Sequence, residues 1–273
     1  MVASEVYPNA PIAMVVAEIR HPASDALSNA EWSNIKQALS AITPVARTEN
    51  AVEIDLQSGS QKITKLTRFV SRDLHQSISF KEDAIVVEST QYAGWTSFLQ
   101  MVQGALSARQ DIAPVDGLER IGLRYIDEIR PPDSTSLTEA SSWKEWVSVE
   151  LLGPISLQSA VNHPITGQQG VAVLSASPGI TYTLRYGGGT GQAFTSSSNL
   201  KRRTEPSGSF FLIDIDGAWH PSEDLIPEFS VSKIADTLNH LHEPISAIFE
   251  SLITDRLRNE VLRIEHNTTV AGH

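Results

Sequence analysis

A long amphipathic run near the end of the chain places the strongest constraint on its fold. Hydrophobic residues recur at intervals of three and four between Val231 and Val261, which is the spacing that puts them on one face of a helix. Such a helix needs an apolar surface to pack against, and the rest of the chain must supply it. Pro244 lies inside the run and predicts a kink or break near His242, whose ring is then expected to bond a backbone carbonyl that the proline frees.

Short alternating segments fill much of the remaining sequence and predict β-strands. In the first half they lie at 12–20, 52–56, 63–70, 76–80, 84–89 and 118–129, with amphipathic helices predicted at 30–42 and 95–106. In the second half they lie at 171–176, 180–186 and 210–215. Polar turns separate most neighbouring strands, which favours antiparallel meanders and an α+β fold class.

A turn-rich segment divides the chain into two linked halves. The predicted organisation is an N-terminal α+β half at 1–132, a linker at 133–142, a C-terminal α+β half at 143–264 ending in the long helix, and a disordered tail at 265–273. The halves can be read as repeats, because Leu123-Arg124-Tyr125 matches Leu184-Arg185-Tyr186 and each meander ends near an amphipathic helix.

The segment Gly187 to Ser209 is rich in Gly, Ser and Thr and is predicted to be a mobile loop. Its glycine run, Gly187 to Gly191, lacks the Lys-Ser/Thr pair of a phosphate-binding P-loop and favours a flexible hairpin or loop. The basic triplet Lys201-Arg202-Arg203 is expected to be solvated, although it could bind an acidic partner or RNA locally.

Composition removes several classes of function. The chain has no cysteine, which excludes disulfides, thiolate metal sites and a cysteine nucleophile. Its net charge of −11 makes nucleic acid an unlikely direct ligand. The sequence has no signal peptide and no membrane-spanning run, so we expect a cytoplasmic protein, and it has no motif for a cofactor, so none is expected.

Several motifs spread along the chain resemble a sporadically distributed bacterial family of uncharacterised proteins. The most specific are the opening Tyr7-Pro8-Asn9-Ala10-Pro11 and the strand Arg120-Ile121-Gly122-Leu123-Arg124-Tyr125. Further matches are Ile12, Glu18-Ile19-Arg20, Arg68-Phe69, Ser71, Tyr92, Trp95, Phe98, Ile126, Leu241-His242, Ile245, Phe249-Glu250 and Ile253-Thr254. The resemblance leads us to expect Phe and Asn where this chain has His21 and Asp127. It implies an accessory gene, such as one from a defence, toxin–antitoxin or prophage locus, and supplies no reaction and no catalytic residues.

Arginines on the predicted strands are the first candidates for a binding site. Alternation puts Arg120 and Arg124 on one face of their strand and Tyr125 on the other. If these arginines converge with Arg68 and Arg185, they would bind a carboxylate, a phosphate or an acidic partner segment. The alternative is that they are ordinary strand residues, paired with acidic neighbours such as Glu119, Asp127 or Glu128.

Aromatic residues complete the ligand hypothesis. A pocket for a small anionic ligand, in a binding protein or an enzyme, would be lined by Arg120, Arg124, Arg185, Tyr92, Trp95 and Tyr125. A metal site has weaker support: Asp214 and Asp216 point the same way on a strand and His220 follows, but two outward aspartates before a turn need no metal.

The sequence contains no recognisable catalytic motif, and no catalytic residue is assigned. We therefore expect a non-enzymatic accessory protein that binds another macromolecule, as an immunity, antitoxin-like or phage-defence component. Its expected partner is a protein, for example the product of a neighbouring gene. A second copy of the same chain, in a homo-oligomer, is also a candidate partner. The alternative is the small-ligand protein or enzyme with the arginine-lined pocket.

Overall fold

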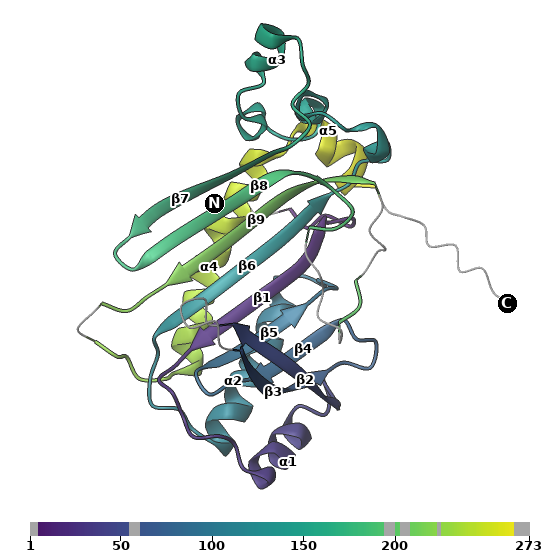
Figure 1. The fold of residues 1–273 in the computed structure, drawn as a ribbon. Coiled ribbons are helices and arrows are strands. Elements are labelled where there is room, and N and C mark those ends of the chain that lie inside the picture. Colours follow the sequence, from purple (N-terminus) through teal and green to yellow (C-terminus); the bar gives the residue numbers. More distant parts are fainter. Residues whose placement is uncertain (1–4, 55–60, 194–199, 203–207, 223–224, 265–273) are drawn as a thin grey trace, which may run out of the picture.

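In the computed structural model, an antiparallel sheet carries helices on one of its faces (Figure 1). The structure describes residues 5–54, 61–193, 200–202, 208–222 and 225–264, and the side chains of 49–65 lie outside this description. The predicted tail at 265–273 and Arg203 also lie outside the described residues. The nine-stranded sheet has the order β2-β3-β4-β5-β1-β6-β9-β8-β7. Together with the helices, it confirms the predicted α+β fold class.

The elements follow one another along the chain as strands interrupted by a few helices. The strands are β1 (Ile12–Arg20), β2 (Val45–Ile54), β3 (Gln61–Val70), β4 (Gln76–Phe80), β5 (Ala84–Ser89), β6 (Arg120–Ile129), β7 (Gln168–Ser177), β8 (Ile180–Thr190) and β9 (Ser209–Trp219). The α-helices are α1 (Asn29–Ala38), α2 (Trp95–Ile112), α3 (Ser156–Val161), α4 (Val231–Leu252) and α5 (Asp255–Leu257). Short 3-10 turns lie at Ser134–Ser136, Ala140–Glu145 and Val149–Leu152, and a π-helical turn lies at Arg258–Leu262.

The chain traces a similar path twice. In each case a first strand is followed by a meander whose last strand returns to pair with it, β5 with β1 and β9 with β6, and a long helix follows, α2 or α4. Strands β1 and β6 then pair with each other at the centre of the sheet. The matching tripeptides of the sequence lie on β6 and β8, which hold different places in this path, so they do not mark equivalent positions.

The predicted linker at 133–142 lies in the connection between β6 and β7. Strand β6 pairs with both β1 and β9, so the sheet is continuous from one half to the other. The segment itself buries Ser134 and Ala140, and the Ala140 N–H donates to the carbonyl of Ile165. Local turn chemistry therefore indicated an irregular connection, while the packing of that connection depends on a distant residue.

The helices form where local signals and the core agree. Ser28 caps α1 in a capping box with Glu31. Helix α4 buries Ile234, Leu238 and Leu241 against the sheet, so the predicted amphipathic face is the one that packs.

The predicted helix of the C-terminal run is not continuous to Val261. It passes through Pro244 without interruption and ends instead at Leu252. Ile253 is extended because it bridges to Val147, and the Ser148 N–H donates to the Leu252 carbonyl. A tertiary contact, which periodicity does not reveal, therefore ends the helix.

The predicted mobile loop begins later than the sequence suggests, because Gly187 to Thr190 belong to β8 and pair with β9. A Cβ atom on Gly187 would lie 2.4 Å from the carbonyl oxygen of Gln168, so the close approach of β7 requires glycine at this position. Lys201, farther along, has its backbone bonded to the Leu74 carbonyl and the Thr90 hydroxyl. The rest of the segment, at 194–199 and 203–207, lies outside the described residues.

Candidate functional site

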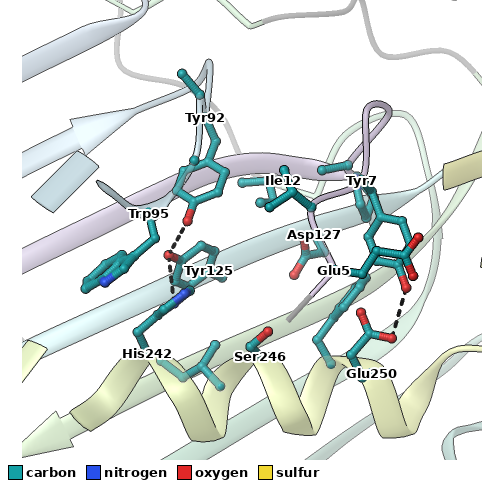
Figure 2. Close-up of a pocket in the computed structure, with 17 residues that line it drawn as sticks. Glu5, Tyr7, Ile12, Tyr92, Trp95, Tyr125, Asp127, His242, Ser246 and Glu250 are labelled. Atoms are coloured by element: carbon teal, nitrogen blue, oxygen red, sulfur yellow. Dashed lines mark hydrogen bonds between the residues drawn. The ribbon is translucent and has the colours of Figure 1, made fainter. Parts of the chain in front are cut away.

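A cavity of about 430 Å³ lies between the helix-covered face of the sheet and α4 (Figure 2). Its walls come from the segment before β1, the turn before α2, strand β6 and helix α4. Exposed residues at the edge, Glu5, Val6 and Ala93, mark its opening to solvent. The remaining lining residues are Tyr7, Ala10, Pro11, Ile12, Tyr92, Gly94, Trp95, Tyr125, Asp127, His242, Ile245, Ser246, Phe249 and Glu250.

The N-terminal wall of the cavity is anchored to the C-terminal turn and to β6. The backbone N–H of Asn9 donates to the Leu262 carbonyl at 3.0 Å, and its side chain donates to the Val261 carbonyl at 3.1 Å. The Glu128 N–H donates to the carbonyl of Pro11 at 2.9 Å, which continues the sheet pairing beyond β1. The Tyr-Pro-Asn-Ala-Pro motif is therefore an anchored wall of the cavity.

One side of the cavity carries a chain of uncharged hydrogen-bonding groups. The Tyr125 hydroxyl donates to the Tyr92 hydroxyl at 3.1 Å and lies 3.2 Å from Nδ1 of His242. The ring of Trp95 stacks on His242 with the centroids 4.2 Å apart, and its Nε1 donates to the Asn239 carbonyl oxygen at 2.7 Å. Burial lowers the pKa of His242 to about 4, so this imidazole is neutral at pH 7.

The bonding of His242 differs from the expectation drawn from Pro244. Its Nδ1 bonds the hydroxyl of Tyr125 on β6, not a backbone carbonyl that the proline frees. The helix brings this ring over the sheet because Leu241 and Ile245, its neighbours on the same side of α4, pack into the core.

The other side of the cavity carries paired carboxylates. The Tyr7 hydroxyl donates to Glu250 at 3.0 Å, and the guanidinium of Arg258 binds the same carboxylate at 3.1 Å. Burial, with the hydrogen bond to Glu250, raises the pKa of Tyr7 to about 12. Glu5 is bound by Arg263 at 2.6 Å. The carboxylates at this end therefore have cationic or hydroxyl partners already.

Asp127 lies between these two groups in the view of Figure 2. It is two residues beyond Tyr125 on β6, so alternation points both side chains to the helix-covered face. Only 3% of Asp127 is exposed, and none of the described residues donates a hydrogen bond to its carboxyl group. Burial, with a smaller effect from Asp214, raises the pKa of Asp127 to about 8.

The arginines singled out in the sequence lie on the opposite face of the sheet. Arg124 binds Asp214 through two hydrogen bonds of 2.7 and 2.6 Å, and Arg185 lies 3.9 Å from the same carboxylate. Arg120 binds Glu18 and Asp216 at 3.1 and 3.2 Å.

Arg68 belongs to the same face, where it binds Glu88 and the Ser77 hydroxyl. All these arginines therefore have carboxylate partners, as the alternative interpretation held. The partners are Glu18, Glu88, Asp214 and Asp216, which lie on other strands of the sheet, and not the neighbours Glu119, Asp127 or Glu128.

The predicted pocket of arginines and aromatic residues is accordingly divided by the sheet. Tyr92, Trp95 and Tyr125 line the cavity, whereas Arg120, Arg124 and Arg185 do not. The physical reason is the alternation of β6 itself, because Arg124 and Tyr125 are adjacent and must point to opposite faces. A single pocket formed by both groups is therefore wrong.

Sequence reasoning assigned no role in a site to Tyr7, Asp127, Ser246 or Glu250, and these residues complete the cavity. A signal for some of them is present, because Asp127 follows Tyr125 at strand spacing and Ser246 and Glu250 follow His242 at helical spacing. These two groups could be joined into one site only by knowing that α4 packs over β6, and that packing belongs to the tertiary structure.

The weak metal candidates have other partners or are exposed. Asp214 and Asp216 bind arginines, and His220 is exposed at the end of β9. Within the described residues, no group of at least three His, Asp or Glu side chains is arranged to hold a metal ion.

The fold and site define an α+β protein with a ligand-sized, largely apolar cavity. Within the described ranges, no helix combines the length and apolar composition needed to cross a membrane. Comparison with models of protein families finds no match, and neither does comparison with curated proteins. The family resemblance therefore stays a prediction, although many of the residues on which it rests gather at this cavity.

Proposed function

We propose that the protein binds a small organic molecule in the cavity between β6, α4 and the N-terminal segment. The observation that carries this proposal is the buried Asp127 carboxyl group, which faces a cavity of about 430 Å³ and has no hydrogen-bond or salt-bridge partner among the described residues. A buried polar group without a partner costs free energy, and a ligand that pairs with it would recover that cost.

The size and composition of the cavity support this function. Its volume falls within the range of about 300 to 1,000 Å³ that is typical of sites for small molecules. Its lining is mainly apolar and aromatic, with a few polar groups that would fix the orientation of a ligand: Tyr92, Asp127, His242 and Ser246. This is the usual division between surface that supplies affinity and groups that supply specificity.

The charge of the lining does not support the predicted anionic ligand. The lining residues that the structure describes include no lysine or arginine, and the arginines expected to bind an anion are paired with carboxylates on the other face. A small-ligand function therefore has support, but at a different site and with a different ligand chemistry.

A pair of tryptophan substitutions tests the function. Ser246 lines the cavity on α4, and its neighbour Ala247 is exposed on the same helix. We expect S246W to fill the cavity and weaken binding of phenylbutylamine, phenylbutanol or phenylbutanoate at least about tenfold, whereas A247W leaves it unchanged. Ligand-observed NMR measures this difference. If no member of this set binds, or if S246W binds as the wild type does, the proposed function fails.

A second function, binding of a protein partner, is supported by strand β7. This edge strand exposes Val171, Val173 and Leu174, and no charged residue occurs in its sequence. Edge strands are usually protected by charges or proline, because their free backbone groups can pair with another chain. The partner that suits it is a second copy of the chain, since identical uncharged strands can pair antiparallel without bringing like charges together.

A lysine on this edge tests the second function. We expect wild-type protein to form a dimer in sedimentation experiments and V173K to be monomeric, because paired lysines would repel across the interface. V149K, at an exposed valine outside the sheet, is the matched control and should remain dimeric. A monomeric wild-type protein at high concentration would refute pairing through β7.

A further inference from the structure

We propose that the molecule held in the cavity carries a cationic amine, which pairs with the Asp127 carboxylate. This inference rests on the proposed function, because it names the chemical class of the ligand for the same site. It also predicts a single ammonium group attached to an apolar body.

The charged side chains at the cavity are acidic. Glu5, Asp127 and Glu250 line it, and among the described residues no lysine or arginine does so. His242 adds no positive charge, because burial lowers its pKa to about 4. An anion would therefore meet like charges in a partly dry site, whereas a cation would meet opposite ones.

Asp127 differs from the other acidic residues in having no partner among the described residues. Glu250 is bound by Arg258 and Tyr7, and Glu5 is bound by Arg263. The Asp127 carboxyl is 3% exposed and receives neither a salt bridge nor a hydrogen bond from any described residue. One cationic group is thus needed at one place, which is why a monoamine suits the cavity and a polyamine gains nothing.

The walls beside Asp127 also suit a cation. Aromatic rings line both sides of the cavity: Tyr7, Tyr92, Trp95, Tyr125 and Phe249. The face of an aromatic ring carries a negative quadrupole, which attracts an ammonium group while the rest of the ring packs against hydrocarbon. The same lining can therefore hold the charged group and the apolar body of one small amine.

Binding should displace a proton from Asp127. The titratable groups at the cavity and on the neighbouring strand are Glu5 and Tyr7 of the N-terminal segment, Tyr92 before α2, Tyr125 of β6, His242 and Glu250 of α4, and Asp214 of β9 on the opposite face. None of these supplies a positive charge near neutral pH. An ammonium beside Asp127 favours the carboxylate, so about one proton should leave as the amine binds at pH 7.

Three probes with one carbon skeleton test the charge of the ligand. Phenylbutylamine, phenylbutanol and phenylbutanoate differ in their terminal group, which is cationic, neutral or anionic. We expect the amine to bind wild-type protein at least about tenfold more tightly than either of the others and to raise the melting temperature by about 3 °C at saturation. Calorimetry in buffers of different ionisation enthalpy should show the released proton.

The variant D127N removes the charge and keeps the shape. We expect its affinity for phenylbutylamine to fall at least about tenfold, its affinity for phenylbutanol to stay within about threefold, and proton release to disappear. D111N changes the net charge equally at an exposed position on α2 and should behave as the wild type. Melting of each variant without ligand checks that it folds.

The outcomes separate this inference from the proposed function. If S246W blocks the probes but phenylbutanol or phenylbutanoate binds as tightly as the amine, the cavity function stands and the cationic ligand is refuted. Equal amine affinity in D127N and wild type also overturns the inference. If S246W leaves every affinity unchanged, binding occurs elsewhere and the proposed function itself fails.

Discussion

Asp127 and Glu128 are consecutive residues of β6, both almost fully buried, and the sheet gives them opposite environments. Glu128 lies on the face without α2 and α4, where it accepts hydrogen bonds from Arg130 at 2.7 Å and the Ala193 N–H at 2.9 Å and pairs with Arg202 at 2.5 Å. Asp127 faces α4 and the cavity, where no described residue supplies a donor.

The pKa values of the two carboxyl groups follow this difference. Burial raises the pKa of both, but at Glu128 the hydrogen bonds from Arg130, Arg202 and Ala193 outweigh it and leave the pKa below its ordinary value. At Asp127 nothing opposes burial, and the pKa rises to about 8. A buried carboxylate is therefore structural where the fold supplies its partners, and it is available to a ligand where the fold does not.

The largest expected effect comes from breaking the partnered side of this comparison. E128Q leaves the largely buried guanidinium groups of Arg130 and Arg202 without their carboxylate, so we expect the free energy of unfolding to fall by about 3 kcal/mol. D127N should instead raise the free energy of unfolding at pH 7, because the folded wild type must keep a proton on Asp127 that the unfolded chain has released, whereas asparagine needs none. Urea denaturation measures both, and a cost for D127N as large as that for E128Q would contradict the comparison.

The pH dependence of stability should sharpen the comparison. The folded protein keeps a proton on Asp127 that the unfolded chain releases above about 3.8, so the free energy of unfolding falls as pH rises from there through about 8. Above pH 6.5, where the burial of His242 no longer contributes, the slope should approach about 1.4 kcal/mol per pH unit. D127N should lack this slope, and an identical slope in wild type and D127N would refute it.

Glu128 should act on the acid side only. Its pKa is lowered in the folded protein, so its contribution is fully present above the ordinary value of 4.5 and is lost as pH falls through the folded value. E128Q should therefore lose part of the acid sensitivity of the wild type while keeping the alkaline slope that belongs to Asp127.

A smaller effect tests the uncharged network beside Asp127. Y125F removes the hydroxyl that donates to Tyr92 and leaves Nδ1 of His242 without this partner, so we expect a loss of about 1 kcal/mol. Y182F is the matched control, because Tyr182 is equally buried on β8 and none of the described residues hydrogen-bonds its hydroxyl. Equal costs for the two variants in urea denaturation would show that the network adds no stability.

The smallest effect is expected at the border of the arginine-bearing face. Arg185 has 44% of its side chain exposed and lies 3.9 Å from Asp214, which Arg124 already binds at 2.6 Å. R185A should therefore change the free energy of unfolding by less than about 0.5 kcal/mol. A loss above about 1 kcal/mol would show that this face depends on the whole arginine network and not on the closer pair.

Much of the fold could be predicted because its local signals agree with its packing. The alternation of β6 and the apolar face of α4 are each visible in the sequence, and each forms as expected. The end of α4 could not be predicted, because Ile253 leaves the helix to bridge to Val147, a contact between segments far apart in the chain.

The cavity was predictable only in part. Tyr92, Trp95 and Tyr125 were candidates from the sequence, but they were joined to arginines that lie across the sheet. Tyr7 and Glu250 could not be connected by any local pattern, since their contact spans 243 residues. Strand alternation puts Asp127 on the face of Tyr125 and Glu128 on the opposite face, but nothing local shows which of the two carboxyl groups has donors.

The sequence by itself determined the α+β class, the faces of β6 and the absence of thiol chemistry, because these follow from side-chain type and from periods of two and 3.6 residues. Only the tertiary structure decided which buried carboxylate has partners. That depends on which strand and helix cover each face of the sheet. Hydrogen-bond donors from elsewhere in the chain lower the pKa of a buried carboxyl group, and burial without such donors raises it. The same assembly leaves Asp127 facing the cavity with a carboxyl group that no described residue binds, which is the group we propose that the ligand pairs with.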